Sequence, residues 1–234
     1  MRRASAYPDA QTDHRQDRRQ DHASITSRIA WIVITALSLA IAAVASRYFQ
    51  FDPTTYFAEQ REVYVNRELA LGLHILGGIV ALATGPFQFV ASIRHRWVKL
   101  HRALGIVYVS GCTVAALGGL ALAPTAHGGA IASWGFTLLA LCTLVTTYTA
   151  LVLALAHRFA DHRRWMIRSF SLTFAGVTLR LLLGVYSGLH AAGLVSFEFT
   201  TAYIAIAWLC WVPNLLLAVW ATRQPARPRG LLRQ

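Results

Sequence analysis

The sequence predicts an all-α integral membrane protein, a bundle of six transmembrane helices with both termini in the cytoplasm. The chain has 234 residues, of which 56% are hydrophobic and only 14% are charged, whereas a typical soluble domain carries about a quarter charged residues. Six apolar runs are each long enough to cross the hydrocarbon of a bilayer as a helix, which takes ~20 residues. They cover 29–46, 69–92, 103–123, 130–156, 166–189 and 200–221.

The segments outside these runs set the domain organisation. Residues 1–27 are polar and offer almost nothing to bury, so we expect a disordered cytoplasmic segment. Residues 28–222 then form the six-helix membrane domain, and residues 223–234 form a basic cytoplasmic tail. Within the second run, the Gly85-Pro86 step predicts a kink or a break, because proline removes a backbone donor.

The basic residues predict the orientation. Of the 22 Lys and Arg residues, eighteen lie in the N-terminal segment, in the loops after the second and fourth runs, in the tail, or directly beside these segments, at Arg28 and Arg168; three lie in the opposite loops. Since cytoplasmic loops are enriched in Lys and Arg, both termini are expected in the cytoplasm. The net charge of +12 brackets apolar runs and forms no patch on a folded domain. This pattern favours the lipid bilayer as partner and argues against nucleic acid.

One arginine, Arg180, lies well inside the fifth run. Helical spacing places it on one face with Thr173, Gly176, Gly184 and Gly188. Small residues permit close helix approach in membranes, so this face is expected to contact other helices. No acidic residue occurs within any run. Because an unpaired buried guanidinium has no stabilising purpose, we interpret Arg180 as a ligand-binding residue.

His74 lies in the outer half of the second run, also among small residues. It is either a ligand-binding residue or a histidine satisfied by a carbonyl or hydroxyl of a neighbouring helix. In the first case, His74 and Arg180 would line one cavity that opens to the outside. Such a cavity would bind or move a small anionic or lipidic molecule.

Two further histidines follow basic turns of similar sequence, His101 after RHRWVKL and His162 after AHRFAD. The similarity suggests that spans two to five are two hairpins related by a parallel repeat, with His101 and His162 at one depth. Paired imidazoles facing each other in a helix bundle can ligate the iron of haem b, and His74 is a candidate for a second haem site. The alternative is that both histidines anchor helix ends at the headgroups.

The stretches LHILGGIVALATGPFQF, IRHRWVKLHRALGIVYV, HRRWMIRSFSLTFAGVTLRL and AWLCWVPNLLLA resemble the bacterial multi-pass membrane family DUF2306, a domain of unknown function. The resemblance covers most of residues 69–220. It implies a multi-pass protein of the bacterial inner (cytoplasmic) membrane and supplies no established activity.

More distantly, the six-span plan and KLHRALG are similar to the ascorbate-reduced transmembrane cytochromes b. In that family, histidines of spans two and four hold one haem and those of spans three and five another. His101 and His162 match the second pair, and His74 matches span two. Span four of this chain has no histidine, so the first pair is incomplete.

Two functions therefore remain open. The first is a b-type haem protein that carries electrons in the membrane through His101 and His162. The second is non-redox binding or transport of a small anionic or lipidic molecule by His74 and Arg180, and a scaffold for membrane partners is a third reading. No phosphate loop, zinc-ligand spacing or hydrolase triad occurs. The sequence does not establish whether the protein is an enzyme, nor its oligomeric state.

Overall fold

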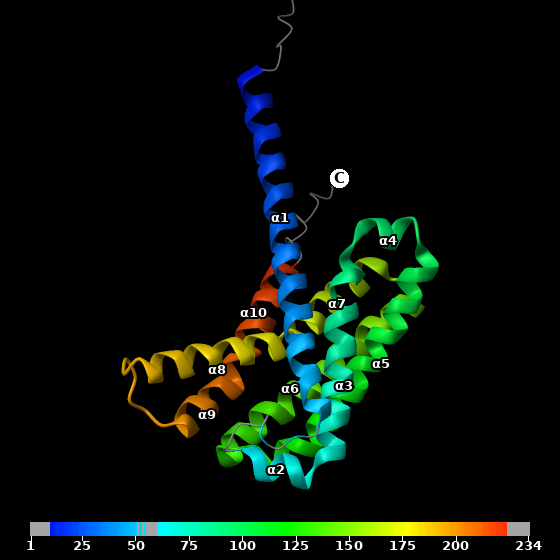
Figure 1. Cartoon of the computed structure of the whole chain (residues 1–234). Coiled ribbons are helices and arrows are strands. Elements are labelled where there is room, and N and C mark those ends of the chain that lie inside the picture. The colour runs from blue at the N-terminus through cyan, green and yellow to red at the C-terminus, as the bar shows by residue number, and fades with distance from the viewer. Residues whose placement is uncertain (1–9, 51, 53, 55–59, 224–234) are drawn as a thin grey trace, which may run out of the picture. The chain divides into compact units, whose positions relative to one another are not determined.

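The computed structural model describes residues 10–50, 52, 54 and 60–223, with side chains from residue 28 onward. Every regular element among these residues is a helix, which confirms the all-α class. The chain divides into two units, residues 1–37 and 38–234, and the packing described below is that of the second unit. Its course is drawn in Figure 1.

The first half of the chain forms α1 (Ala10–Ala45), η1 (Ser46–Gln50), α2 (Arg61–Asn66), α3 (Glu68–Thr84), η4 (Pro86–Phe89), α4 (Ala91–His95) and α5 (Val98–Leu122). The second half forms η5 (Ala123–Thr125), α6 (Gly129–Leu155), α7 (Phe159–Thr173), α8 (Ala175–Ala191), α9 (Phe199–Leu209) and α10 (Val212–Ala221). Residues 10–27, expected to be disordered, are drawn as the first part of α1. The domain boundaries at 27/28 and 222/223 stay predictions, and the tail from 224 lies outside the described residues.

Six stretches of the described chain are long and apolar enough to cross a membrane, as the sequence predicts. They are Arg28–Gln50, Glu68–Phe89, Val98–Thr125, Gly129–Leu155, Phe159–Ala191 and Phe199–Ala221. The orientation continues to rest on the distribution of Lys and Arg, and the two-hairpin repeat stays a hypothesis.

Three spans are interrupted, and only the first interruption was expected. Helix α3 ends at Thr84, and Pro86 opens the 3-10 turn η4. The fifth span changes direction at Phe174, between α7 and α8 (Figure 1). The sixth is broken at Cys210 and Trp211, just before Pro213 in the first turn of α10. The missing N–H of Pro213 accounts for this last break.

Helices α3 and α5 lie side by side (Figure 1) and approach most closely where glycines meet backbone. A Cβ placed on Gly77 would lie 2.3 Å from the backbone nitrogen of Ala115, and one on Gly118 would lie 2.6 Å from that of His74. The prediction for the fifth span was wrong in its outer part. A Cβ on Gly184 or Gly188 would have no described atom within 4 Å, because α8 turns this face away from the bundle.

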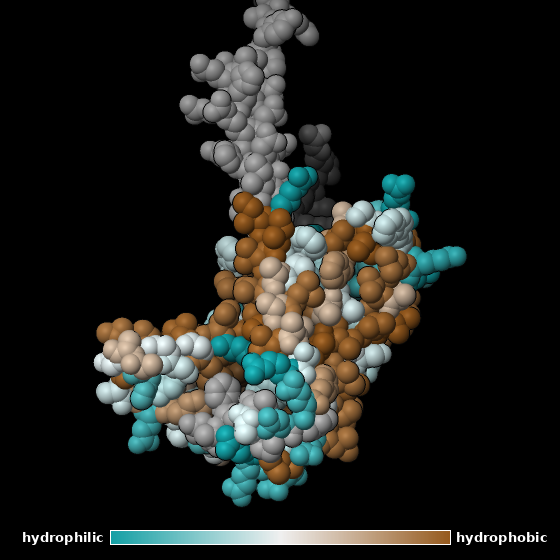
Figure 2. All heavy atoms as spheres, viewed as in Figure 1, coloured by the Kyte–Doolittle hydropathy of each residue, from teal (hydrophilic) through white to brown (hydrophobic). Residues whose placement is uncertain are grey.

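The surface of the second unit has the distribution that a bilayer requires. Side chains on the outward faces of the helices are large and apolar, with Leu69 78%, Leu155 71% and Trp220 70% exposed. In the view of Figure 2, hydrophilic residues gather near α4 and near α2, and hydrophobic residues lie between them. The core is accordingly narrow, and polar side chains inside it need an explanation of their own.

Candidate functional site

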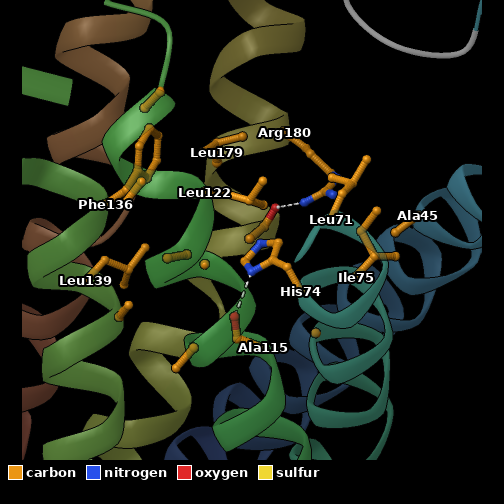
Figure 3. A pocket seen from close by; sticks show the side chains of 18 of the residues that line it. Ala45, Leu71, His74, Ile75, Ala115, Leu122, Phe136, Leu139, Leu179 and Arg180 are labelled. Atoms are coloured by element: carbon orange, nitrogen blue, oxygen red, sulfur yellow. Dashed lines mark hydrogen bonds between the residues drawn. The ribbon is translucent and has the colours of Figure 1, made fainter. Parts of the chain in front are cut away.

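A cavity of about 260 Å³ lies within the second unit, enclosed mainly by α3, α5, α6 and α8 (Figure 3). Its wall is mostly aliphatic and aromatic, as Leu71, Leu139 and Leu179 illustrate. The basic side chains in this wall that belong to membrane spans are His74 and Arg180, and a third, His127, lies between two spans. The structure thus brings together the two residues that the sequence predicted to share a cavity.

Arg180 lies on the second turn of α8, half-buried. Its Nη1 donates to the carbonyl of Gly176 at 2.9 Å, one turn back on the same helix. No carboxylate among the described side chains lies within 4 Å of the guanidinium. The two ion pairs among these side chains join Asp161 to Arg158 and to Arg164. A guanidinium has five N–H donors. The bond to one carbonyl therefore leaves most N–H donors of the guanidinium, and its whole positive charge, for another partner.

His74 comes from α3 and reaches across to α5, where its Nδ1 lies 2.8 Å from the carbonyl oxygen of Ala115. A carbonyl can only accept, so Nδ1 carries the proton, and in the neutral ring Nε2 is an acceptor. The close approach of the helices at Gly118 and Gly119 makes this contact reachable. The structure shows the bond to a neighbouring carbonyl. The ring also lines the cavity, and its role as a ligand-binding residue stays a hypothesis.

Two residues of the segment before α3 close one side of the cavity, and the sequence did not identify them as site residues. Tyr64 in α2 donates its hydroxyl to Oε1 of Gln60, and Gln60 is 4% exposed. Burial raises the pKa of Tyr64 well above its usual range, so the phenol stays neutral and remains a donor. The sequence places Gln60 and Tyr64 between two spans, and that position does not show whether their side chains are buried.

His101 and His162 lie near the start of α5 and α7, outside the wall of this cavity. Seven residues beyond each, Tyr108 and Ser169 are hydrogen-bonded to each other at 2.9 Å. Seven residues are about two helical turns, so the two histidines lie at one depth, as expected. Nδ1 of His162 donates to the carbonyl of Ala150 at 2.8 Å, and Nδ1 of His101 is buried without a hydrogen-bond partner among the described residues.

A six-coordinate haem would need two imidazoles as axial ligands, which is the role that the sequence predicted for His101 and His162. A metal-ligating histidine usually donates its second N–H to a carbonyl, and the bond from His162 to Ala150 has this form. Among the described residues, no group of three or more His, Cys, Asp or Glu side chains could hold a metal ion. That finding does not bear on a pair of axial ligands, so haem binding stays a hypothesis.

A cluster of hydroxyl groups at the centre of the bundle was not predicted, and we call it the central polar cluster. Tyr108 on α5 is hydrogen-bonded to Ser169 and, at 3.1 Å, to Thr173 on α7. Ser169 is also bonded to Thr147 on α6 at 2.7 Å, and Thr173 lies 3.5 Å from the sulfur of Cys112. Tyr108, Ser169 and Thr147 are each 0% exposed. Cys112 and Thr173 line the floor of the cavity.

The fold and this site define a multi-pass helical membrane protein with a cavity inside its membrane domain. The chain belongs to the family described as predicted membrane protein (DUF2306), whose model matches residues 71–222. No match was found among curated proteins or among solved structures. The family confirms the resemblance seen in the sequence, and the comparisons add nothing to the more distant similarity to cytochromes b.

Proposed function

We propose that this protein binds a small amphipathic anion inside the membrane, in the cavity that His74 and Arg180 line, and holds or moves it without redox chemistry. The proposal rests on the surroundings of the Arg180 side chain. Its guanidinium lies in an apolar cavity with a backbone carbonyl as its hydrogen-bond partner and no carboxylate within 4 Å among the described side chains. Charged residues at such depth are costly, and they mark binding sites or pathways.

The chemistry of the wall defines the class of ligand. Aliphatic residues such as Leu71 and Leu139 suit a hydrocarbon chain, whereas Arg180 suits an anionic head group. His74 adds a second criterion, because Nδ1 is committed to the carbonyl of Ala115 and neutral Nε2 can only accept. A head group with both an anionic oxygen and an O–H, such as a phosphate monoester, satisfies the two residues together.

The test measures thermal unfolding in phosphatidylcholine nanodiscs with dodecyl phosphate or neutral dodecanol as probe. Dodecyl phosphate should stabilise the protein, by about 2.7 kcal/mol at a hundred times its dissociation constant, and dodecanol should not. Arg180→Gln removes a charge-assisted contact worth about 1.5–3 kcal/mol, which is roughly a 10- to 150-fold loss of affinity.

The matched control is Arg96→Gln, which removes an exposed arginine of the loop before α5. It should bind dodecyl phosphate as the unmodified chain does. Equal stabilisation by dodecyl phosphate and dodecanol, or an unchanged response of Arg180→Gln, would contradict the proposal.

The second candidate function is electron transfer through haem b held by His101 and His162. It is supported by their common depth and by the carbonyl partner of His162. The test is the absorption spectrum of protein from haem-replete cells. A reduced-minus-oxidised band of six-coordinate haem that is lost in His101→Ala and His162→Ala supports this function, and a colourless preparation excludes it.

A further inference from the structure

Polar side chains from η4, α5, α6 and α7 occur between the cytoplasmic end of the bundle and the cavity. Counting along α5 from His101 to Gly119, which lies against the ring of His74, gives a rise of about 27 Å, close to the ~30 Å of the hydrocarbon. The groups that follow this path, here called the polar column, are His101, His162, Gln88, Tyr108, Ser169, Thr147, Thr173 and Cys112.

The upper half of the column is continuous. From the cavity floor, Thr173 is hydrogen-bonded to Tyr108 at 3.1 Å, Tyr108 to Ser169 at 2.9 Å, and Ser169 to Thr147 at 2.7 Å. Each of these groups is a hydroxyl, which can accept one hydrogen bond while it donates another. Three helices contribute these hydroxyls, and the hydroxyl of Thr173 is also hydrogen-bonded to the carbonyl oxygen of Ser169 in its own helix at 3.2 Å.

The lower half contains two buried polar atoms that lack partners among the described residues. They are Nε2 of Gln88, whose side chain is 5% exposed, and Nδ1 of His101. Gln88 lies against α5 at Gly105, where an added Cβ would be 3.5 Å from Oε1 of Gln88. Gly105 is one turn above His101 and one turn below Tyr108. Buried polar atoms of this kind are normally satisfied by bound water. The relay proposed below requires such water between the histidines and the central polar cluster.

We propose that the polar column is a proton relay between the cytoplasmic surface and the cavity. A hydroxyl that accepts a proton on a lone pair releases its own proton to the next oxygen, and rotation of the O–H restores the starting state. No bond between heavy atoms changes and no oxidant is needed. One proton enters at His101 or His162 and one leaves at Thr173 into the cavity, or the reverse. The relay does not depend on the ligand proposed above.

The plainer role for such a cluster is to hold α5, α6 and α7 together, since hydroxyls often bond across membrane helices. That role needs no continuity between the cytoplasmic end and the cavity. It also leaves Gln88 and His101 unexplained, because unpartnered buried groups contribute no stability. The two roles differ in what the loss of one hydroxyl does to proton movement.

The experiment uses the full chain in phosphatidylcholine vesicles that contain potassium and a pH-sensitive dye. Dilution into potassium-free buffer with valinomycin makes the interior negative, and acidification of the interior reports proton entry. Vesicles with protein should acidify faster than protein-free vesicles. Tyr108→Phe, which removes one oxygen from the centre of the column, should lose this excess rate, and Gln88→Leu should lose it as well.

The matched control is Tyr148→Phe. Its hydroxyl is also bonded to a threonine, Thr113 at 3.1 Å, but the residue is 44% exposed and lies outside the column. It should conduct as the unmodified chain does. Where Tyr108→Phe fails to give folded protein, Ser169→Ala breaks the same chain. The proposal is overturned when the unmodified chain conducts no faster than protein-free vesicles, or when folded Tyr108→Phe or Ser169→Ala conducts as Tyr148→Phe does.

Discussion

Adjacent glycines of α3 offer a sharp test of the packing, because Gly77 faces α5 and Gly78 does not. A Cβ at Gly77 would lie 2.3 Å from the nitrogen of Ala115 and 2.5 Å from the oxygen of Gly111, whereas a Cβ at Gly78 would have no described atom within 4 Å. Ordinary carbon contacts are about 3.5–4.0 Å. Since the atoms met at Gly77 are backbone, α3 and α5 must separate by about 1 Å or more to admit a methyl group.

The expected result is a large difference between Gly77→Ala and Gly78→Ala. Both substitutions gain helix propensity, about 1 kcal/mol in soluble helices, so that gain cancels in the comparison. Overpacking costs typically about 1–3 kcal/mol, and here no flexible side chain can absorb it. We therefore expect Gly77→Ala to be less stable than Gly78→Ala by at least about 2 kcal/mol.

The assay is equilibrium unfolding in dodecyl maltoside micelles titrated with sodium dodecyl sulfate and followed by far-UV circular dichroism. The two variants differ by one methyl group at neighbouring positions, so their unfolded states are closely matched. Coincident transitions would show that α3 and α5 are not packed backbone to backbone at Gly77, and the position of His74 would lose its support.

Two further predictions concern polar contacts of Asn214 in α10 and of Tyr64 in α2. Asn214→Leu removes the amide that donates to the hydroxyl of Thr178 at 2.9 Å; it should lower stability by about 0.6–1.7 kcal/mol, the range of such bonds in membranes, and an unchanged unfolding midpoint would contradict this. In the folded protein, burial raises the pKa of the Tyr64 phenol well above its usual range. The unfolded phenol ionises near pH 10, so stability is complete below that pH and is lost as pH rises through it. Tyr64→Phe should show less alkaline loss in thermal unfolding between pH 8 and 11, and identical pH profiles would refute this.

Hydropathy predicted the six spans because the bilayer imposes a strict requirement on the length of an apolar helix, whereas the orientation predicted from the Lys and Arg positions stays a prediction. A spanning helix must be apolar over a fixed length, and Pro86 breaks the second span where the chain must leave the helix. The turn at Phe174 was not predicted. No proline or charged residue marks it, and both neighbouring segments are helical on their own. Its position depends on how α7 and α8 pack, which local sequence does not encode.

The same distinction applies to the site. Arg180 and His74 were identified because charged and titratable residues are rare inside apolar runs, so the residue type alone is informative. Serine and threonine are not informative in this way. Thr84, Thr143 and Thr146 each bond a carbonyl of their own helix, whereas Thr147, next in sequence to Thr146, bonds Ser169 on another helix. Only the packing separates the two cases.

The close contact of α3 with α5 also explains how one histidine can serve the cavity. Because Gly118 has no side chain, the ring of His74 comes within 2.8 Å of the carbonyl of Ala115. That bond fixes the proton on Nδ1. The cavity wall therefore has a hydrogen-bond acceptor, Nε2 of His74, and a permanent donor, the guanidinium of Arg180. A wider spacing of the helices would free the ring to present either nitrogen, and the ligand that we propose would then lose the ordered pair of donor and acceptor. The glycine contacts therefore determine the chemistry of the cavity as well as the stability of the bundle.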